Sequence, residues 1–141
     1  RYSKSYIKRT TALKKEFTEE EIMNFLKSRL SHERNEVVVS IFCDNKGQFI
    51  KTAEIDRGTS TETAFRTREL VEAAIRCGAS KVIISHNHPK GFAVPSQADV
   101  NATVDLKDIF AQLDIELIDH IIVADDDCFS MRMHKKYNSI F

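Results

Sequence analysis

The sequence predicts a single layered α/β domain, and three observations support this prediction. The chain has 141 residues, which is enough for one compact core and too few for two. Apolar residues make up 42% of it and charged residues 30%, the composition of an ordinary globular protein. Segments with helical periodicity alternate with short runs rich in β-branched residues, which is typical of helices packed against a sheet.

The first segment, residues 1–15, is a basic arm with six Lys or Arg side chains and no acidic one. We interpret it as a solvated arm that partly docks on the domain, because no periodicity places its charges on one face; contact with nucleic acid is the alternative. The domain itself is expected over residues 16–141. Its first helix runs from Thr18 to about Leu30, and Thr18 with Glu21 forms a capping box.

A β-hairpin is predicted after this helix. Residues 36–44 are rich in β-branched side chains and indicate a buried strand, and residues 48–55 indicate its returning partner. The segment Asp44–Gly47 between them has the Asp, Asn and Gly residues that favour a tight turn. Small and hydroxyl-bearing residues over 58–63 predict a loop that ends the hairpin.

The remaining predicted elements are a helix over residues 64–77, a strand over 81–85, a helix from about 96 to 113, and strands over 115–124 and 128–132. Gly78 follows the first of these helices and is expected to end it in a left-handed conformation. The strand over 81–85 is a short apolar run, which suits a central position in the sheet. The last two strands are expected to form a hairpin around the acidic turn Asp125–Asp127.

Charge and cysteine content exclude several classes of protein. There are 21 Lys or Arg and 21 Asp or Glu residues, so no overall electric field attracts the domain to nucleic acid or to an anionic membrane. The apolar runs are strand-sized, so no membrane-spanning helix is expected. Cys43, Cys77 and Cys128 form neither a disulfide framework nor a cysteine-rich zinc site, which suits a reducing compartment, and we expect a cytoplasmic location. The chain begins with Arg1 rather than Met, which indicates a piece of a longer product.

The densest polar segment, residues 85–99, directly follows the most apolar strand, at the sheet edge where ligands tend to bind. His86 and His88 are two residues apart on extended backbone, so both imidazoles project to the same side. Asp99 at the start of the next helix can add an anionic ligand. Two His and one carboxylate leave a fourth tetrahedral position open, as in a catalytic zinc site. A capping box of Ser96 and Asp99 explains the same carboxylate without a metal, and the two interpretations are compatible.

The same segment resembles a known family signature. The spacing from His86 to Asp99 matches the H-x-H-x7-S-x2-D signature of the JAMM (MPN+) metalloproteases, and Ser96 stands at the serine of that signature. The further segments that are similar to the RadC-like branch of this family are His86–Pro89 with Gly91, Pro95-Ser96, Thr67–Glu69 and Leu117–Ile122. The resemblance extends over about residues 34–132. It implies the JAMM/MPN architecture, similar to cytidine deaminases, with a mixed β-sheet flanked by helices.

The resemblance implies a zinc-dependent hydrolase in which an activated water molecule attacks a peptide or isopeptide bond. The Zn²⁺ ligands that it implies are His86, His88 and Asp99. The family also needs a glutamate from an early strand as general base. We prefer Glu36, which begins a predicted strand, to Glu33, which lies in a charged connector. The hydroxyl of Ser96 is expected to stabilise the developing oxyanion.

The sequence departs from the RadC-like pattern at the rim of the expected cleft. Lys90 stands where that branch usually has a small Ser, and Phe92–Val94 replaces a more polar stretch, so the rim is more apolar and gains a cation. The helix-hairpin-helix region that many RadC-like proteins carry upstream is not visible in residues 1–33. The expected partner is a peptide or protein substrate, nucleic acid is expected only through the basic arm, no membrane partner is expected, and a homo-oligomer is compatible with the sequence.

Two further side chains have weaker interpretations. His120, on a strand after Asp119, could support the metal ligands from behind, but a strand histidine is more often a packed structural residue, so we leave it outside the predicted site. Cys43 lies in an apolar strand, where a thiol tends to stay protonated, so we do not expect it to be a nucleophile.

Other classes of enzyme fit the sequence less well. A zinc deaminase needs H-x-E and a later P-C-x-x-C, whereas position 88 is His and no two cysteines are close. The His-Asn-His triplet is contiguous, unlike the dispersed motif of HNH nucleases. The serious alternative is a non-catalytic RadC-like module that binds protein or DNA in DNA repair while it keeps the fold.

Overall fold

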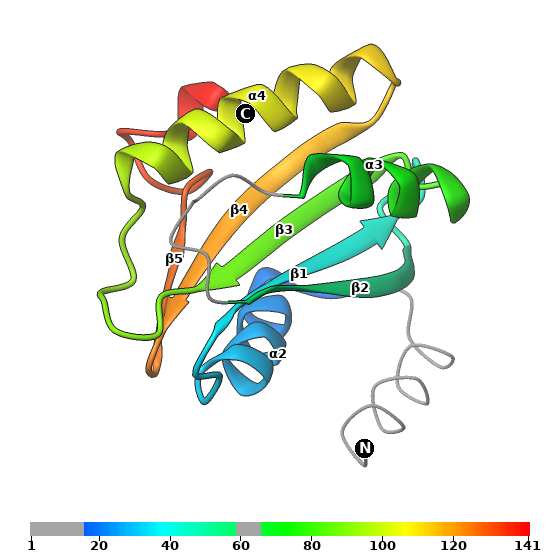
Figure 1. Cartoon of the computed structure of the whole chain (residues 1–141). Helices are drawn as coiled ribbons and strands as arrows, with labels where there is room; N and C mark the ends of the chain where they lie inside the picture. Colours follow the sequence, from blue (N-terminus) through cyan, green and yellow to red (C-terminus); the bar gives the residue numbers. More distant parts are fainter. Residues whose placement is uncertain (1–15, 59–65) are drawn as a thin grey trace.

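The computed structural model describes residues 16–58 and 66–141, and it confirms the predicted α/β domain with a mixed sheet flanked by helices (Figure 1). The helices are α2 (Glu19–Leu30), α3 (Thr67–Arg76), α4 (Gln97–Gln112) and the 3-10 helix η1 (Asn138–Ile140). The strands are β1 (Glu36–Cys43), β2 (Phe49–Gly58), β3 (Lys81–Asn87), β4 (Glu116–Ala124) and β5 (Asp127–Ser130).

The strands form one sheet in the order β2-β1-β3-β4-β5. Strand β1 is antiparallel to both β2 and β3, and β4 is antiparallel to β5. Only β3 and β4 run parallel in the described part of the sheet, joined by the crossover helix α4. The carboxyl ends of β3 and β4 therefore meet at the same edge, which is the edge where α4 begins (Figure 1).

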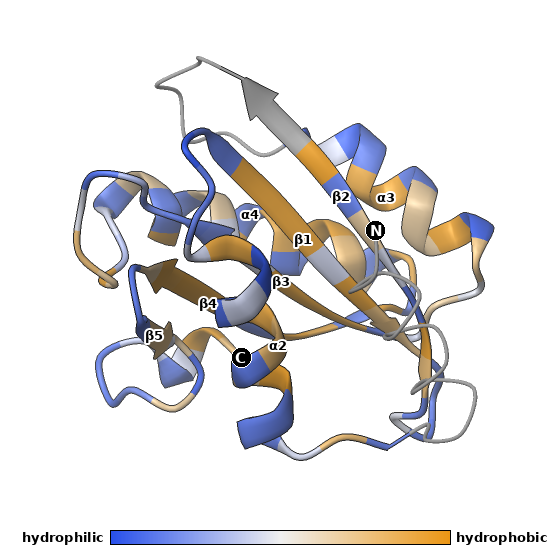
Figure 2. Cartoon of the chain, turned by 90° about the horizontal axis from the view of Figure 1, so that it is seen from below, coloured by the Kyte–Doolittle hydropathy of each residue, from blue (hydrophilic) through white to orange (hydrophobic). Residues whose placement is uncertain are grey.

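The helices cover the two faces of the sheet unequally. Helices α3 and α4 lie on one face and α2 lies on the other (Figure 1). The core under α3 and α4 contains Val38, Phe42, Ile55, Leu70, Ala74, Ala79, Val82, Ile84, Leu106, Phe110, Ile115 and Leu117. The core under α2 contains Leu26, Leu30, Val37, Val39, Ile41, Ile83, Ile121 and Val123. Successive residues of β1 alternate between the two cores, and β1, β3 and β4 have mostly apolar colours in Figure 2.

Local signals in the sequence explain several of these elements. Helix α2 begins with the predicted capping box, in which the Thr18 hydroxyl accepts from the Glu21 amide and the Glu21 carboxylate accepts from the Thr18 amide. In the hairpin turn, the side chain of Asp44 accepts two amide hydrogen bonds and Gly47 has a φ of 80°. Gly78 has a φ of 72° directly after the end of α3, as a left-handed cap requires.

The structure differs from the predicted boundaries at several places. Strand β2 continues beyond residue 55 to Gly58 because it keeps pairing with β1. Strand β3 continues beyond residue 85 to Asn87, because His86 still pairs with β1 and Asn87 pairs with β4. Strand β5 begins at Asp127 and ends at Ser130, earlier than predicted at both ends; Asp125, with a φ of 51°, makes the tight turn before it. The described part of α3 begins at Thr67.

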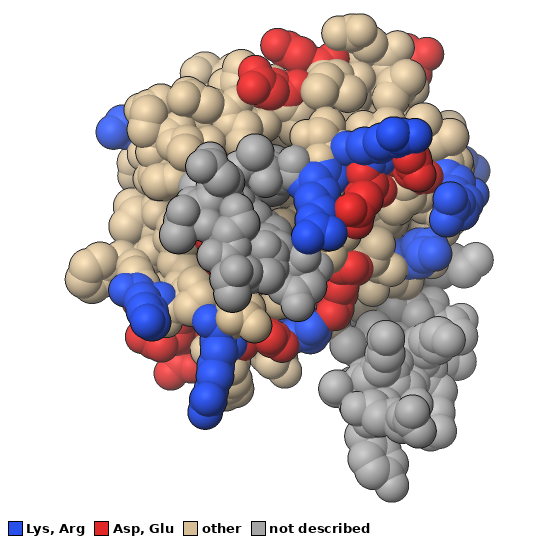
Figure 3. Space-filling model, viewed as in Figure 1, with Lys and Arg blue, Asp and Glu red and all other residues tan. Residues whose placement is uncertain are grey.

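Some expectations concern residues outside the described part of the chain. The basic arm 1–15, the loop after β2 and the predicted first residues of the helix at 64–65 belong to this group. None of the helices in residues 16–58 and 66–141 has the length and apolar character that crossing a bilayer requires. On the face seen in Figure 3, Lys and Arg residues lie next to Asp and Glu residues, as the zero formal charge leads one to expect.

Candidate metal centre

The two histidines lie at the carboxyl end of β3. His86 is in the strand and His88 directly follows it, so their side chains share one face of the sheet. Val38 is the cross-strand partner of His86 and belongs to the core under α3 and α4, which places both imidazoles on the α4 side. The His88 amide also donates to the carbonyl of Val123 in β4, so the sheet holds the backbone of this histidine beyond the end of the strand.

Asp99 comes from the first turn of α4, and the local sequence explains its position. Ser96 is the N-cap: its hydroxyl accepts from the Asp99 amide at 3.0 Å, and its own amide donates to Asp99 Oδ2 at 2.9 Å. This capping box turns the carboxylate back toward the end of β3. Asp99 is fully buried. The capping interpretation of Ser96 and Asp99 and the ligand interpretation of Asp99 are both compatible with this geometry.

The three side chains converge on one point. His88 Nε2 is 3.0 Å from both His86 Nε2 and Asp99 Oδ2, and His86 Nε2 is 3.3 Å from Asp99 Oδ1. One ligand atom from each residue lies within 4.8 Å of the other two, so this group could hold a metal ion. The loop from Pro89 to Pro95 therefore brings α4 back to β3 in the way that the sequence pattern required.

The electrostatics of the cluster favour a carboxylate beside imidazoles. The hydrogen bond to Asp99 raises the pKa of His88, against the opposing effect of burial. Burial opposes ionisation of the Asp99 carboxyl, but the neighbouring His86 and His88 imidazoles outweigh this effect, so its pKa lies well below its usual range. The site therefore offers a permanent negative charge in a buried position.

Hydrogen bonds on the far side of the cluster show that the residues fit a metal ion. His88 Nδ1 lies 2.8 Å from the Phe92 carbonyl oxygen, which can only accept, so Nδ1 carries the proton and neutral His88 presents a lone pair at Nε2. Among the described residues, no hydrogen-bond donor satisfies the buried Asp99 Oδ1. With His88 neutral, its Nε2 and the Asp99 carboxylate are acceptors that face one another, which suits a cation between them.

Glu36 lies on the same face as these ligands. Val38 pairs with His86, so Glu36, two residues before Val38, comes opposite His88 when the antiparallel register is continued. Its negative charge contributes to the raised pKa of His88, after the larger effect of Asp99. Glu36 is half-buried.

Glu33, the alternative base, is engaged elsewhere. Its carboxylate accepts from the Arg29 guanidinium at 2.6 Å, on the α2 side of the chain. Arg29 also binds Glu54 of β2, so the ion pair ties α2 to the hairpin. The Glu33 carboxylate is therefore held in an ion pair, whereas Glu36 lies at the start of β1.

Asn87, between the two histidines, fixes the segment that carries Glu36. Its side-chain oxygen accepts from the Val37 amide at 2.8 Å, and its amide group donates to the carbonyl of Asn35 at 2.9 Å and to that of Glu33 at 3.4 Å. Asn87 is 3% exposed, so these bonds are shielded from water. One buried side chain thus couples the end of β3 to the start of β1.

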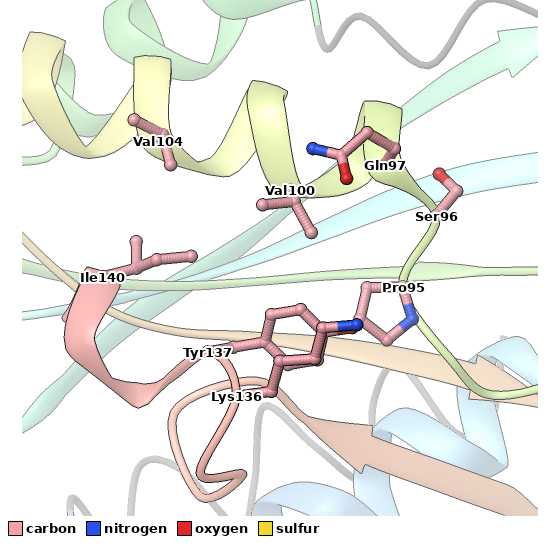
Figure 4. A pocket seen from close by; sticks show the side chains of 8 residues that line it. All are labelled: Pro95, Ser96, Gln97, Val100, Val104, Lys136, Tyr137 and Ile140. Carbon is pink, nitrogen blue, oxygen red and sulfur yellow. The ribbon is translucent and has the colours of Figure 1, made fainter.

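A pocket of about 370 Å³ opens next to the cluster, between the start of α4 and the C-terminal segment (Figure 4). Its lining residues are Pro95, Ser96, Gln97, Val100, Val104, Lys136, Tyr137 and Ile140. Ser96 belongs to both the pocket and the capping box that positions Asp99. The pocket thus combines apolar surface and the cation of Lys136 with Ser96, the residue that caps the helix carrying Asp99.

Two buried residues next to the cluster were not part of the predicted site. His120 Nε2 in β4 lies 2.7 Å from His86 Nδ1, and His120 Nδ1 lies 2.6 Å from the hydroxyl of Thr103 in α4. The sequence offered one signal for His120, a histidine on a strand of the same small sheet, and none for Thr103. Burial raises the pKa of the Cys43 thiol, which disfavours its thiolate form.

Comparisons with known proteins identify one family. Residues 17–137 match the family model of the RadC-like JAB domain, a wider range than the resemblance in the sequence covered. This match includes all of the strands, the helices α2, α3 and α4, and every residue of the candidate site.

Several bacterial proteins are similar to this chain. A UPF0758 protein of Pseudomonas savastanoi is 35% identical over 111 residues, which are 79% of this chain and 50% of the relative. A UPF0758 protein of Chlorobaculum tepidum is 39% identical over 114 residues, 81% of this chain and 51% of the relative. A UPF0758 protein of Haemophilus influenzae is 36% identical over 111 residues, 79% of this chain and 50% of the relative. The chain thus spans about half the length of the curated relatives it matches, and their names specify no reaction.

Proposed function

The chain belongs to the family of RadC-like JAB domains, and on this premise we propose that it is a zinc-dependent hydrolase of peptide or isopeptide bonds. The family includes metalloproteases, which makes hydrolysis the first reaction to consider. One observation carries the proposal: His86, His88 and Asp99 each bring a ligand atom within 4.8 Å of the others, where β3 ends and α4 begins.

The ligand set favours zinc among the common metal ions. Two imidazole nitrogens and one carboxylate are typical ligands of catalytic zinc, whereas Mg²⁺ and Ca²⁺ prefer oxygen ligands throughout. His86, His88 and Asp99 would hold the ion and leave a fourth position open. A zinc ion in such a site supplies Lewis acidity, which lowers the pKa of water to about 7 and polarises a carbonyl group.

The other polar residues of the site have roles that follow from their positions. Glu36, opposite His88, would accept the proton of the attacking water and return it to the leaving amine. The hydrogen bond between Ser96 and the Asp99 amide uses a lone pair of the hydroxyl and not its proton. That proton can therefore be donated to the carbonyl oxygen as negative charge develops on it.

The substrate is proposed to be a polypeptide with an apolar side chain near the bond that is cleaved. Phe92, in the loop between the ligands, is 83% exposed, and Val94 is 48% exposed. The pocket beside Ser96 is lined partly by Val100, Val104 and Ile140. A substrate chain that crosses the metal centre would meet apolar surface on the α4 side.

The experiment that tests this proposal compares two glutamate variants. The unaltered chain, purified without a His tag, is expected to hold one zinc ion and to generate new amino termini in a diverse peptide mixture, as detected by mass spectrometry. Glu36→Gln is expected to keep the zinc and to lose about 10²–10⁴-fold in rate, the usual contribution of a general base. Glu33→Gln is the matched control and is expected to retain the activity.

Each other outcome has a clear meaning. Unchanged zinc content in His86→Ala would show that the ligand set is wrong. Hydrolysis that survives Glu36→Gln would show that Glu36 is not the base. A chain that binds zinc and cleaves no peptide would favour the alternative, a module that binds protein or DNA and has lost or never had activity.

A further inference from the structure

Three buried polar side chains, His86, His120 and Thr103, form a continuous chain of hydrogen bonds behind the candidate metal centre. Their exposed fraction is 0% in each case, so water does not satisfy their polar atoms, and a polar atom without a partner in the protein would carry a considerable cost. The chain of bonds begins at His86 Nδ1, passes through both nitrogens of His120, and ends at the Thr103 hydroxyl.

The direction of these bonds follows from the acceptors around Thr103. Its hydroxyl oxygen is 2.6 Å from the Asp99 carbonyl oxygen and 3.8 Å from the sulfur of Met131, and both of these atoms can only accept. The short contact requires the hydroxyl proton to point to the Asp99 carbonyl. The proton between Thr103 and His120 must then come from His120 Nδ1.

This assignment fixes the two histidines in turn. Neutral His120 with its proton on Nδ1 has a lone pair on Nε2, so it accepts from His86 Nδ1 at 2.7 Å. His86 therefore carries its proton on Nδ1 and presents an unprotonated Nε2 to His88 and Asp99. The reverse tautomer of His120 would place a proton on His86 Nε2 and block a metal ion.

We propose that His120 and Thr103 are positioning residues that lock His86 in the tautomer that binds the metal through Nε2. The inference rests on the metal site of the proposed function and adds two residues to it. Histidine ligands usually donate their second nitrogen to a carboxylate, a backbone carbonyl or water. Here the acceptor is a second neutral histidine, whose own tautomer is fixed by a hydroxyl.

The chain of bonds also connects two ligands to each other. Thr103 lies one helical turn after Asp99 and donates to its backbone carbonyl, so the same helix that supplies Asp99 sets the tautomer of His86. Strand β4, which carries His120, is the parallel neighbour of β3, and Ile84 is the cross-strand partner of His120. His86, two residues after Ile84, therefore has its side chain on the same face as His120.

The variants that test this proposal are matched in size. Thr103→Val removes the hydroxyl and keeps the shape, and Thr103→Ser restores the hydroxyl. Ser130→Ala removes a buried hydroxyl that donates to the neighbouring Asp119 and has no part in the chain of bonds. Zinc affinity is measured by competition with a chromophoric chelator. Thr103→Val is expected to bind zinc about 10–100-fold more weakly, the usual effect of losing such a support, while Thr103→Ser and Ser130→Ala stay close to the unaltered chain.

A spectroscopic measurement keeps the test independent of folding in the variants. Long-range ¹H–¹⁵N correlation spectra of the unaltered chain report which nitrogen of each histidine carries a proton. We expect His120 to be neutral with its proton on Nδ1 in the metal-free chain, and His86 to have its proton on Nδ1 and zinc on Nε2 after zinc is added.

The outcomes separate this inference from the proposed function. A proton on His120 Nε2 in the metal-free chain would overturn the tautomer lock, whatever the chain does with zinc. Zinc affinity unchanged in Thr103→Val would overturn it too, even if that variant is less stable, because a structural role alone would lower stability and spare affinity. If the chain has the expected tautomer but binds no zinc, the proposed function is contradicted. The role of His120 in metal binding is then contradicted too.

Discussion

At the scale of single residues, hydrogen bonds to the backbone orient the side chains of the cluster. His88 donates from Nδ1 to the Phe92 carbonyl, and Asp99 Oδ2 accepts from the Ser96 amide. These bonds orient the groups before any ligand binds. His88 Nε2 and the Asp99 carboxylate then face each other, and either a proton or a cation can bind between them.

The shared proton leads to a prediction about pH. Asp99 raises the pKa of His88, so a proton stays on this histidine to a higher pH than usual. A proton and a zinc ion compete for His88 Nε2, so zinc affinity is expected to rise by about tenfold per pH unit below the His88 pKa and to level off above it. Zinc titrations at several pH values measure this slope.

The raised pKa of His88 also makes the stability of the metal-free chain depend on pH. A histidine with a raised pKa in the folded chain stabilises the metal-free protein below its ordinary pKa, and this contribution is lost as the pH rises through the raised value. The metal-free chain is thus expected to become less stable over the range in which zinc affinity increases. Zinc affinity that is independent of pH in this range would contradict the assignment of His88 as a ligand.

At the scale of elements, two helices begin with the same capping device and only one of the two serves the site. Thr18 and Glu21 close the start of α2, and Ser96 and Asp99 close the start of α4. In α4 the carboxylate of the box is also the candidate ligand. A carboxylate in the first turn is further favoured by the helix dipole, so the function adds little cost to the helix.

The paired boxes give a matched prediction. Ser96→Ala and Thr18→Ala each remove one N-cap hydroxyl and are expected to cost about 1 kcal/mol in the free energy of unfolding, measured by urea denaturation. Only Ser96→Ala is expected to slow hydrolysis, by about 10²–10³-fold, if its hydroxyl stabilises the oxyanion. Zinc affinity is expected to change little, because the Ser96 amide still holds Asp99. Equal hydrolysis by both variants would show that the Ser96 hydroxyl is only a cap.

At the scale of the whole molecule, the candidate site exists only when the sheet and α4 are assembled. The two histidines come from β3, Asp99 from α4 and Glu36 from β1. These elements meet at one edge because β3 lies between the antiparallel β1 and the parallel β4. A metal ion bound there would hold separate elements together.

Zinc is therefore expected to stabilise the folded chain. At a free concentration 100 times the dissociation constant, it should add about 2.7 kcal/mol to the free energy of unfolding, and a chelator should reverse the effect. Urea denaturation with and without zinc measures this difference. His88→Ala is the control and should show no zinc-dependent change; an equal change in this variant would mean that zinc binds elsewhere.

Much of the fold followed from local patterns. Both capping boxes, the turn at Asp44–Gly47 and the left-handed Gly78 depend on interactions within a few residues, so the sequence was enough to predict them. Among the boundaries that differed, the ends of β2 and β3 depend on how far the neighbouring strands β1 and β4 continue to pair with them. The sequence of one strand carries no information about how long the neighbouring strands in the sheet are.

The candidate ligands could be predicted because strand parity puts His86 and His88 on one side and a helix start fixes Asp99. Only the tertiary structure showed that Glu33 pairs with Arg29 and that the register between β1 and β3 brings Glu36 toward His88, the two observations on which the proposal of Glu36 as base rests. It also decided that His120 and Thr103 meet behind His86. Contacts between residues far apart in the chain arise from the packing of whole elements, which periodicity and spacing do not encode.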